Sequence, residues 1–357
     1  MKVGIVGLPN AGKTTLFNAL TQAGAPTAGY PFTTVDPNIA VVEVPDDRLA
    51  RLAATVGATP VSYDTIEFHD IAGLVRGAHA GEGLGNKFLG SIRETDAICH
   101  VVRAHGDDGV PHPDGKVNPI DDLDLIEAEL LLADLAQAEG RLGRVEKQAR
   151  SGDKEAVAER SWLATVVAAL QRGEPVRSVP TPPEAAEAPN RLHALTSKPV
   201  LYVANVDEGA TEPPAEIAAR AAQSDAVAVA LSARIESELA ELPKAEAAEM
   251  REGLGLSESG LERVIRAAYE LLDLVTFFTA GEGSEGLAHS LPRGGTAWDA
   301  AGRVHGEIQA AFIRAEVVSC EELIVAGGYA NAREQAKLRT EGRDYIVADG
   351  DVITIKV

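Results

Sequence analysis

The sequence is poor in cysteine and contains no long apolar run. Its 357 residues include only two cysteines, Cys99 and Cys320, which allow no disulfide framework and no cysteine-based zinc site. No apolar run approaches membrane-spanning length, and no charged-then-apolar leader precedes the first predicted strand. These absences lead us to expect a soluble, cytoplasmic protein that works without a membrane.

Basic residues are also scarce relative to acidic ones. The chain has 33 Lys and Arg against 54 Asp and Glu, for a formal net charge of −21. Such a charge argues against broad electrostatic coating of nucleic acid or anionic membrane, so we expect no sequence-specific DNA binding. A local basic surface that docks on a ribonucleoprotein remains compatible with this composition.

What the sequence does contain is a phosphate-binding motif close to its start. Residues 7–14 read Gly-Leu-Pro-Asn-Ala-Gly-Lys-Thr, which fits the pattern G-x-x-x-x-G-K-[ST]. An apolar, β-branched run precedes the motif and helical spacing follows it, as a P-loop requires. The glycines allow backbone N–H groups to turn toward the α- and β-phosphates. We predict that Lys13 reaches the β- and γ-phosphates and that the Thr14 hydroxyl ligates Mg²⁺.

Two further segments suit a nucleotide-dependent switch. Asp70-Ile71-Ala72-Gly73 ends a predicted strand, so Asp70 is expected to hold Mg²⁺ through water and the Gly73 amide to face the γ-phosphate. Within residues 30–38 a threonine can complete the Mg²⁺ shell, although the segment also fits an ordinary proline-bounded turn. Leu74 stands where Ras-like proteins place the glutamine that orients the attacking water. Leucine cannot do this, so hydrolysis is either slow without a partner or served by another group.

A departure from the guanine-recognition motif is found at residues 205–208. GTPases normally show Asn-Lys-x-Asp at this place, whereas the chain has Asn205-Val206-Asp207-Glu208. The lysine stem that covers the base is missing, and the longer Glu208 side chain is poorly placed to accept from guanine. This favours ATP, or a relaxed choice of base, unless Asp207 takes over the guanine contact. The segment from Ser232 to Arg234 resembles the loop that packs on the base from the other side.

Hydrophobic periodicity predicts an interrupted nucleotide domain followed by a smaller α+β module. Strands are predicted near residues 2–6, 39–44, 64–70, 97–103, 198–205 and 226–232. His100 lies inside one of them and is interpreted as a packed histidine rather than a ligand. In the C-terminal module we predict a helix over 296–311 and a strand–turn–strand over 345–355, with Asp-Gly as its turn.

A helical insertion interrupts the nucleotide domain. A helix capped by Asp121 or Asp122 and a second one near 154–172 predict an antiparallel pair. The alternative is that both helices simply cover the sheet. The Gly-, Pro- and Asp-rich residues 104–119 before them predict a loop.

Together, these motifs resemble the YchF family, the Obg-like ATPases among the translation-associated P-loop NTPases. The likeness extends over essentially the whole chain and is carried by residues 7–21, 30–38, 70–78, 81–89, 115–119, 205–208 and 341–352. It implies an α/β P-loop G domain, an inserted helical coiled-coil domain and a C-terminal ubiquitin-like TGS domain. The implied boundaries are 1–120 and 198–275 for the G domain, 121–197 for the insertion and 276–357 for the TGS domain.

The resemblance also implies a function and a set of site residues. It implies hydrolysis of ATP rather than GTP and binding to the ribosome, as the 50S subunit or the 70S particle. Mg²⁺ would lie on Thr14 and Thr34, and Val206 would contact adenine through its backbone. The phosphates would lie on Asn10, Ala11, Gly12, Lys13, Thr14 and Thr15. Asn10 also matches a P-loop asparagine that helps hold K⁺, which suggests stimulation by K⁺.

A histidine in the 104–119 loop is implied as the substitute for the missing glutamine, and His112 occupies that place. Judged by its sequence context alone, a histidine in such a loop is usually just a surface residue. The family likeness and the local context therefore leave two readings of His112, catalytic and merely exposed.

Rival functions are a GTPase of the same architecture, a small-molecule kinase and a scaffold. A kinase needs an acceptor pocket with a base and lid arginines, of which the sequence shows no set, and a scaffold conflicts with an intact P-loop. In the C-terminal module, Arg333, Lys337, Arg339 and Arg343 form a locally basic segment, interpreted either as an RNA-facing strip or as a solvated face.

Overall fold

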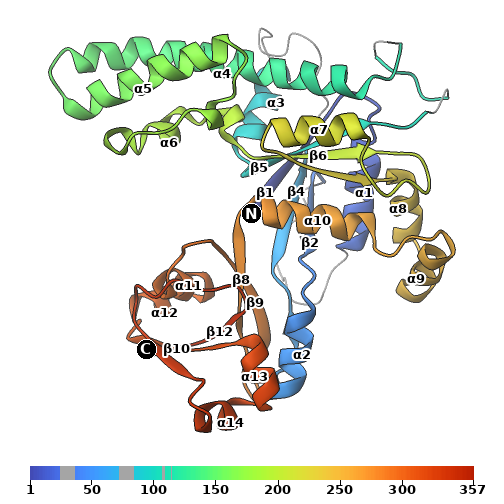
Figure 1. Cartoon of the computed structure of the whole chain (residues 1–357), viewed down its shortest axis with the longest axis vertical. Coiled ribbons are helices and arrows are strands. Elements are labelled where there is room, and N and C mark those ends of the chain that lie inside the picture. Colours follow the sequence, from blue (N-terminus) through green and yellow to red (C-terminus); the bar gives the residue numbers. More distant parts are fainter. Residues whose placement is uncertain (25–36, 72–83, 107–108, 114) are drawn as a thin grey trace. The chain divides into compact units, whose positions relative to one another are not determined.

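The computed structural model describes residues 1–24, 37–71, 84–106, 109–113 and 115–357 (Figure 1). These residues form two compact units. The first contains the described residues among 1–24, 37–41 and 67–268, and the second contains 42–66 and 269–357. Each unit has its own sheet and its own apolar core.

The sheet of the first unit follows the strand predictions closely. Its strand order is β2-β4-β1-β5-β6-β7, and the pairs from β4 to β7 are parallel. The strands are β1 (Lys2–Val6), β2 (Ile39–Glu43), β4 (Thr65–Asp70), β5 (Ala97–Arg103), β6 (Val200–Asn205) and β7 (Val227–Leu231). Every residue of β5 and β6 is buried, as expected for central strands covered on both faces.

Helices cover this sheet. They are α1 (Lys13–Ala23), α3 (Leu84–Arg93), α7 (Ala215–Gln223), α8 (Ala233–Ala240) and α10 (Gly260–Leu271), and α9 (Lys244–Gly253) packs on α8. A single apolar cluster joins the sheet to α3 through Ile92 and to α7 through Ile217. Helix α1 packs against α8, which brings the end of the P-loop close to the start of α8.

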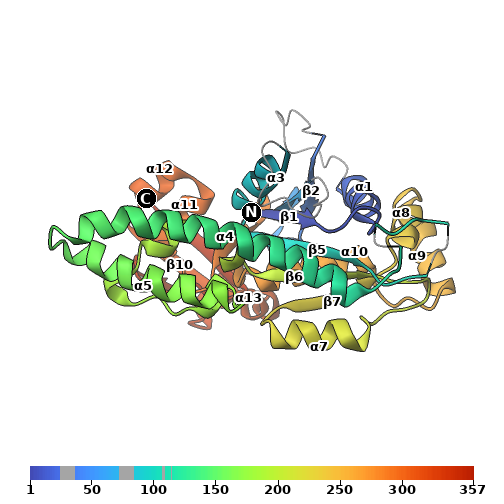
Figure 2. The ribbon, with the colours of Figure 1, turned by 90° about the horizontal axis from the view of Figure 1, so that it is seen from above.

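The helical insertion forms an antiparallel pair, α4 (Pro119–Ala149) and α5 (Lys154–Gln171) (Figures 1 and 2). The chain then returns through η1 (Val176–Ser178), η2 (Pro183–Ala185), α6 (Ala188–Leu192) and η3 (Leu195–Ser197). The predicted cap of α4 was wrong. Asn118 is the N-cap residue and Pro119 occupies the first turn, so Asp121 and Asp122 lie inside the helix.

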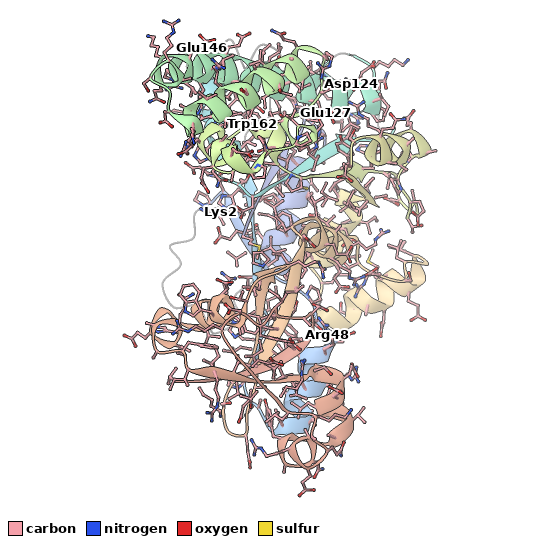
Figure 3. All side chains as sticks on the ribbon, turned by 60° about the vertical axis from the view of Figure 1, so that its left-hand side comes forward. Lys2, Arg48, Asp124, Glu127, Glu146 and Trp162 are labelled. Carbon is pink, nitrogen blue, oxygen red and sulfur yellow. The ribbon has the colours of Figure 1, made fainter. Side chains whose placement is uncertain are left out.

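Helix α4 combines the two alternatives from the sequence, because it covers the sheet and also forms the antiparallel pair with α5. Its first half packs into the sheet cluster through Leu123, Ile126 and Leu130. Its second half pairs with α5, where Trp162 lies in a separate apolar cluster (Figure 3). Near the sheet, Asp124 and Glu127 of α4 both pair with Arg220 of α7 (Figure 3). We refer to the second half of α4 together with α5 to α6 as the helical arm.

A buried carboxylate fixes α4 to the segment that returns to β6. Asp134 is fully buried and accepts hydrogen bonds from the backbone N–H groups of Leu195 and Thr196, at 2.8 and 2.7 Å. The Thr196 hydroxyl donates a third, at 2.7 Å. Three donors satisfy a charge that would otherwise be costly to bury, so this contact sets where the insertion joins the sheet.

The second unit is a mixed sheet with helices on it. Its strand order is β11-β10-β12-β8-β9-β3. The strands are β3 (Val61–Ser62), β8 (Leu274–Thr279), β9 (Gly286–Pro292), β10 (Arg314–Ser319), β11 (Arg339–Glu341) and β12 (Asp351–Lys356). The helices are α2 (Asp47–Val56), α11 (Ala297–Val304), α12 (Gly306–Ala310), α13 (Cys320–Ala326) and α14 (Tyr329–Glu334). Separate apolar clusters join the sheet to α2 and α13, and to α11.

Two predictions for the C-terminal module were wrong. The segment 345–355 is not a hairpin, because only β12 is a strand and it pairs with β10 and β8 instead. The helix predicted over 296–311 is divided into α11 and α12 at His305, whose backbone is extended and whose Nδ1 accepts from the Glu307 N–H at the start of α12. The boundaries proposed for the three domains remain a prediction.

His100 is a packed strand histidine, as the sequence analysis predicted. It is 2% exposed and meets Tyr202 edge to face, with ring centroids 5.9 Å apart. Burial lowers the pKa of His100 to about 4, with smaller effects of Glu127 and Lys13. The neutral ring is therefore the form that the folded core accepts.

We expect the stability of the first unit to fall as the pH drops below the normal histidine pKa. The unfolded chain binds a proton near pH 6.5, whereas folded His100 resists it down to about 4. Unfolding free energy should therefore fall by about 2 kcal/mol between pH 7.5 and pH 5 from this residue. His100→Gln should flatten that dependence in urea unfolding, and the exposed His305→Gln should leave it unchanged. Equal slopes in all three proteins would contradict this.

Both cysteines are free and buried. Burial raises the pKa of the Cys99 thiol to about 12 and that of Cys320 to about 11. Neither thiolate is populated near neutral pH. Among the described residues, no helix is long and apolar enough to span a membrane.

Candidate functional site

The predicted site residues gather at one edge of the first sheet. Its parallel strands point their carboxyl ends the same way, and ligands of such sheets bind at that edge. The P-loop follows β1, Asp70 ends β4, and Asn205 ends β6. Ser232 follows β7, and the loop with His112 follows β5. Segments distant in sequence are therefore brought together by the topology alone.

The two glycines of the P-loop are required by close approach as well as by backbone angle. Gly7 has φ +154° and Gly12 has φ +99°, in the region that favours glycine. A Cβ atom at Gly7 would lie 2.3 Å from the Val101 carbonyl oxygen, and one at Gly12 would lie 2.3 Å from Asn205 Nδ2. Gly12 is also the N-cap residue of α1, so the helix starts where a phosphate would bind.

Lys13 and Asp70 form the charged part of the site. Lys13 is 8% exposed, and its Nζ donates to the Leu8 carbonyl oxygen at 2.7 Å, folded back over the loop. Burial lowers the pKa of Lys13, and the field of Asp70 opposes this. Burial likewise raises the pKa of Asp70, and Lys13 opposes that. Each charge thus stabilises the other in a site that excludes much of the water.

The side chain of Asn205 connects the P-loop to the loop after β7. Its Nδ2 donates to the Ala11 carbonyl oxygen at 3.1 Å, and its Oδ1 accepts from the Ala233 N–H at 3.0 Å. Asn205 is 6% exposed, so both bonds are shielded from water. The residue therefore holds two nucleotide-facing loops at a fixed separation.

The three residues after Asn205 have different hydrogen-bond and ion-pair partners. Val206 is buried, and its N–H donates to the Leu231 carbonyl oxygen at 3.0 Å. The Asp207 carboxylate accepts from the Gly106 N–H at 3.4 Å, toward the loop after β5. Glu208 lies 3.7 Å from Arg234, and both side chains are exposed. The two carboxylates of this segment thus have different partners, the Gly106 N–H for Asp207 and Arg234 for Glu208.

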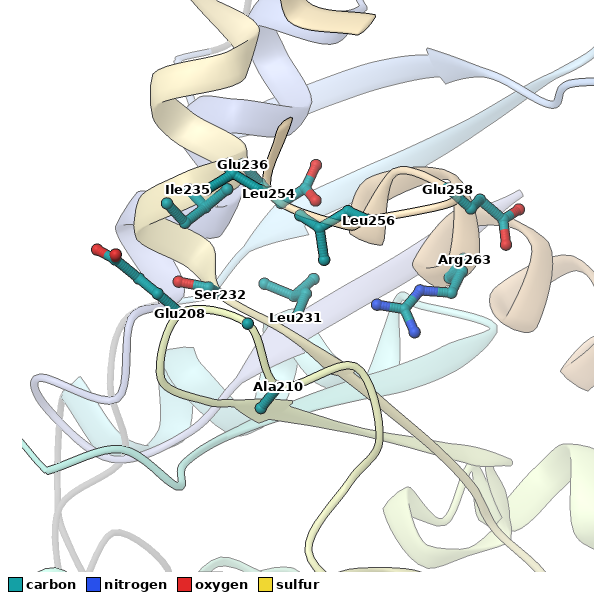
Figure 4. A pocket seen from close by; sticks show the side chains of 11 residues that line it. Glu208, Ala210, Leu231, Ser232, Ile235, Glu236, Leu254, Leu256, Glu258 and Arg263 are labelled. Carbon is teal, nitrogen blue, oxygen red and sulfur yellow. The ribbon is translucent and has the colours of Figure 1, made fainter. Parts of the chain in front are cut away.

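A small hollow adjoins this region (Figure 4). Its volume is about 20 Å³, which is room for a water molecule and not for a base. It is lined by Glu208, Gly209, Ala210, Leu231, Ser232, Ile235, Glu236, Leu254, Leu256, Glu258 and Arg263. A base would therefore lie outside it, against the 205–208 and 232–234 loops. Ser232 caps α8 without using its hydroxyl, which leaves that group for other contacts.

The loop with His112 is held at three successive residues. Arg103, 2% exposed, donates to the Val110 carbonyl oxygen at 2.9 Å. Asn10 of the P-loop donates to the Pro111 carbonyl oxygen at 3.0 Å. His112 Nε2 lies 3.1 Å from Asp122 Oδ2, and these side chains are 6% and 5% exposed. The interpretation of His112 as merely exposed is therefore wrong for its side chain, because the ring is buried against the Asp122 carboxylate.

Some predicted residues lie outside the described part of the chain. They are Thr34, Gly73 and Leu74. Among the described residues, Thr14 is exposed in the first turn of α1 and Thr15 is partly buried beside it. Hydroxyl and carboxylate oxygens are the donors that Mg²⁺ prefers, so Thr14 and Asp70 fit that ion. No group of three or more His, Cys, Asp or Glu side chains suited to a metal occurs among the residues that the structure covers.

Sequence reasoning missed two residues of this site, Arg103 and Asp122. An arginine that ends an otherwise apolar strand is a signal for a buried anchor, because its charge needs local carbonyl partners. Asp122 was recognised only as a possible helix cap. Its contact with His112 depends on how the loop folds back, which no local pattern encodes.

The basic segment of the C-terminal module is occupied by local partners. Arg333 lies 3.6 Å from Glu316, and Lys337 lies 2.9 Å from Glu322. Arg339 pairs with Glu341 and Asp351, and Arg343 donates to the Phe312 carbonyl oxygen. Helix α14 ends before Lys337, so Arg333 and Lys337 do not share a helix face. These contacts favour the solvated-face interpretation over an RNA-facing strip.

Comparison with known proteins gives matches over the full chain. The family model described as 50S ribosome-binding GTPase matches residues 2–135, and the model YchF-GTPase_C, a protein of unknown function (DUF933), matches residues 274–357. A Bacillus subtilis protein named Ribosome-binding ATPase YchF is 50% identical over 99% of this chain and 98% of its own length. A relative of the same name from Haemophilus influenzae is 49% identical, with the same coverage.

A solved structure agrees with these matches. The Schizosaccharomyces pombe YchF GTPase superposes with a TM-score of 0.88 at 32% identity, covering 100% of this chain and 97% of that one. The match supports the α/β P-loop fold with its inserted helices and C-terminal domain. The names of these similar proteins differ in the nucleotide, since the two bacterial relatives are named ATPases and the S. pombe protein is named a GTPase.

Proposed function

Because this chain belongs to the YchF family, we propose that it hydrolyses ATP in preference to GTP and acts as a nucleotide-controlled regulator on the ribosome. The P-loop domain supplies the phosphate site. The observation that carries the choice of base is the arrangement of the two carboxylates after Asn205. Asp207 is turned to the Gly106 N–H, and Glu208 is paired with Arg234.

This arrangement lacks the feature that selects guanine. A carboxylate that accepts from both guanine N1–H and the 2-amino group must face the base edge. Asp207 is instead in contact with the Gly106 N–H, and Glu208 is one methylene longer than the aspartate of the guanine motif. The Val206 N–H donates to the Leu231 carbonyl oxygen. The carbonyl oxygen of Val206 is therefore the backbone group that we propose to accept from the adenine 6-amino group. The same carbonyl would oppose the O6 oxygen of guanine, so the proposal favours ATP.

A GTPase is the second candidate, since a YchF protein of known structure bears that name. It requires Asp207 to leave Gly106 and turn toward the base. That contact, at 3.4 Å, is long enough for such a change to cost little.

The proposed reaction is attack of water on the γ-phosphorus. The bond from phosphorus to the β–γ bridging oxygen breaks, its electron pair leaves with ADP, and the water proton is released with phosphate. Lys13 stabilises the charge on the phosphate oxygens, and the P-loop N–H groups orient them. Bound Mg²⁺, held by Thr14 and Thr34 and through water by Asp70, would neutralise charge on the β- and γ-oxygens. Asn10 is also the proposed contact for a stimulating K⁺ ion.

His112 is the proposed substitute for the missing glutamine. We expect His112→Ala to lower single-turnover ATP hydrolysis by at least about 10-fold and to leave ATP affinity unchanged. Rapid quench with radiolabelled ATP measures the first quantity and calorimetry the second. The exposed His305→Ala serves as control. An unchanged hydrolysis rate in His112→Ala would remove this residue from the mechanism.

Ribosome binding is proposed from the bacterial relatives, whose name includes it. Cosedimentation with 50S subunits and 70S particles, with ATP or ADP present, tests it. Binding that depends on the nucleotide supports the regulatory part of the proposal. Binding absent in both states would contradict it.

A further inference from the structure

We infer that Asp122, in the first turn of α4, positions the imidazole of His112 for hydrolysis. The inference rests on the proposed catalytic role of His112 and adds a second residue to it. Asp122 does not contact the nucleotide in this account. It is a positioning residue that acts through His112.

The first support is the geometry of the contact. His112 Nε2 and Asp122 Oδ2 are 3.1 Å apart, and both side chains are almost fully buried, at 6% and 5% exposed. A carboxylate in that setting requires a polar partner, and a buried imidazole has few orientations available. The pair therefore fixes the ring more firmly than a surface contact would.

The second support is the backbone on either side of the ring. Arg103 holds the Val110 carbonyl and Asn10 holds the Pro111 carbonyl, each at about hydrogen-bond distance. The residue after these two anchors is His112, so its Cα position is set from β5 and from the P-loop. Asp122 contacts the ring itself, through Nε2.

The third support is the chemistry of the pair. An ionised carboxylate only accepts hydrogen bonds, so in this contact the His112 Nε2 is the donor and carries a proton. Nδ1 is then the basic nitrogen of the ring. A ring that takes a proton from the attacking water becomes an imidazolium, and the Asp122 charge stabilises it. This is the work that an orienting carboxylate does for a histidine base in other hydrolases.

A set of variants tests the inference. Asp122→Asn keeps the size of the side chain and removes its charge, and Asp122→Glu keeps the charge and moves it by one methylene. Asp121→Asn is the matched control, because Asp121 lies in the same helical turn and is exposed. It loses the same favourable interaction with the helix N-terminus. Thermal unfolding identifies any variant that fails to fold, and single-turnover hydrolysis and ATP binding are then measured on the full chain.

We expect Asp122→Asn to lower single-turnover hydrolysis about 10-fold with ATP affinity unchanged, and Asp121→Asn to match the parent protein. In His112→Ala the additional change Asp122→Asn should have less than about a 2-fold effect, because the two residues act as one unit. Partial recovery in Asp122→Glu supports the same conclusion.

Three outcomes would overturn the inference. Multiplying effects in the double variant would give Asp122 a separate, structural role. Faster hydrolysis in Asp122→Asn would show that the pair withholds His112 instead of positioning it. Full activity of His112→Ala would reject the role of His112 on which the inference depends, whereas ATP hydrolysis by the parent protein would still uphold the proposed ATPase.

Discussion

Lys13→Ala is expected to reduce ATP hydrolysis by about 10²- to 10³-fold, the scale of losing a preorganised charge contact in a site that excludes water. Lys13 is 8% exposed, and its Nζ already lies over the P-loop at the Leu8 carbonyl. A bound γ-phosphate would replace that carbonyl as its partner. Because the negative charge on the phosphate oxygens changes during the reaction, the lysine contributes to the transition state as well as to binding.

The measurement is single-turnover hydrolysis together with ATP affinity. Lys2→Ala is the control, since Lys2 carries the same charge on the neighbouring strand and its side chain is exposed. The control should hydrolyse at the parent rate. A Lys13→Ala protein that is folded and retains more than about a tenth of parental activity would contradict the assignment of the phosphate site.

Asn205→Ala is expected to weaken nucleotide binding and the fold together. The substitution leaves the Ala233 N–H without its acceptor, in a residue that is 1% exposed, and removes the donor to the Ala11 carbonyl. Each unmet buried group costs about 1–3 kcal/mol, so unfolding free energy should fall by about 3 kcal/mol. Loss of the fixed separation between the two loops should raise the ATP dissociation constant at least about 10-fold.

Urea unfolding and calorimetry measure these two effects. Asn190→Ala is the control, because Asn190 is exposed and its side chain contacts only Glu187 among the contacts described. The control should differ little from the parent protein. A stable Asn205→Ala protein with parental ATP affinity would show that the two loops hold their positions without this side chain.

The phosphate site could be predicted from sequence because its determinants are local. A P-loop requires a buried strand, glycines such as Gly7 and Gly12, and a lysine at the start of a helix. All of these occur within a few consecutive residues. The strand that ends in Asn205 was predicted for a similar reason, since a fully buried parallel strand reads as a continuous apolar run. The hydrogen bonds of its side chain follow from the parallel order of the strands.

The start of α4 shows where local reasoning fails. Three residues in a short stretch can cap a helix, Asn118, Asp121 and Asp122, and propensity does not choose among them. Pro119 determines which residue is the cap, because proline is favoured at the first helical position and the cap then lies one residue before it. Asp122 was thereby left for His112, a partner defined only by the folded loop.

The hairpin prediction for residues 345–355 was wrong for a different reason. Asp349-Gly350 is a strong hairpin signal, and Gly350 does have φ +83°. The Asp349 carboxylate, however, is engaged by Arg48 and by the Thr276 N–H. Long-range partners therefore outcompete the local turn, and β12 pairs with β10 and β8.

The central claim is that this P-loop site prefers adenine. Equilibrium binding of non-hydrolysable ATP and GTP analogues to the parent protein, with Mg²⁺ and K⁺ present, tests it most directly. The account predicts that the ATP analogue binds at least about 10-fold more tightly, since Asp207 is engaged by the Gly106 N–H and Glu208 is too long for the guanine contact. Equal or tighter binding of the GTP analogue would contradict the account, and would identify Asp207 as the base-reading residue.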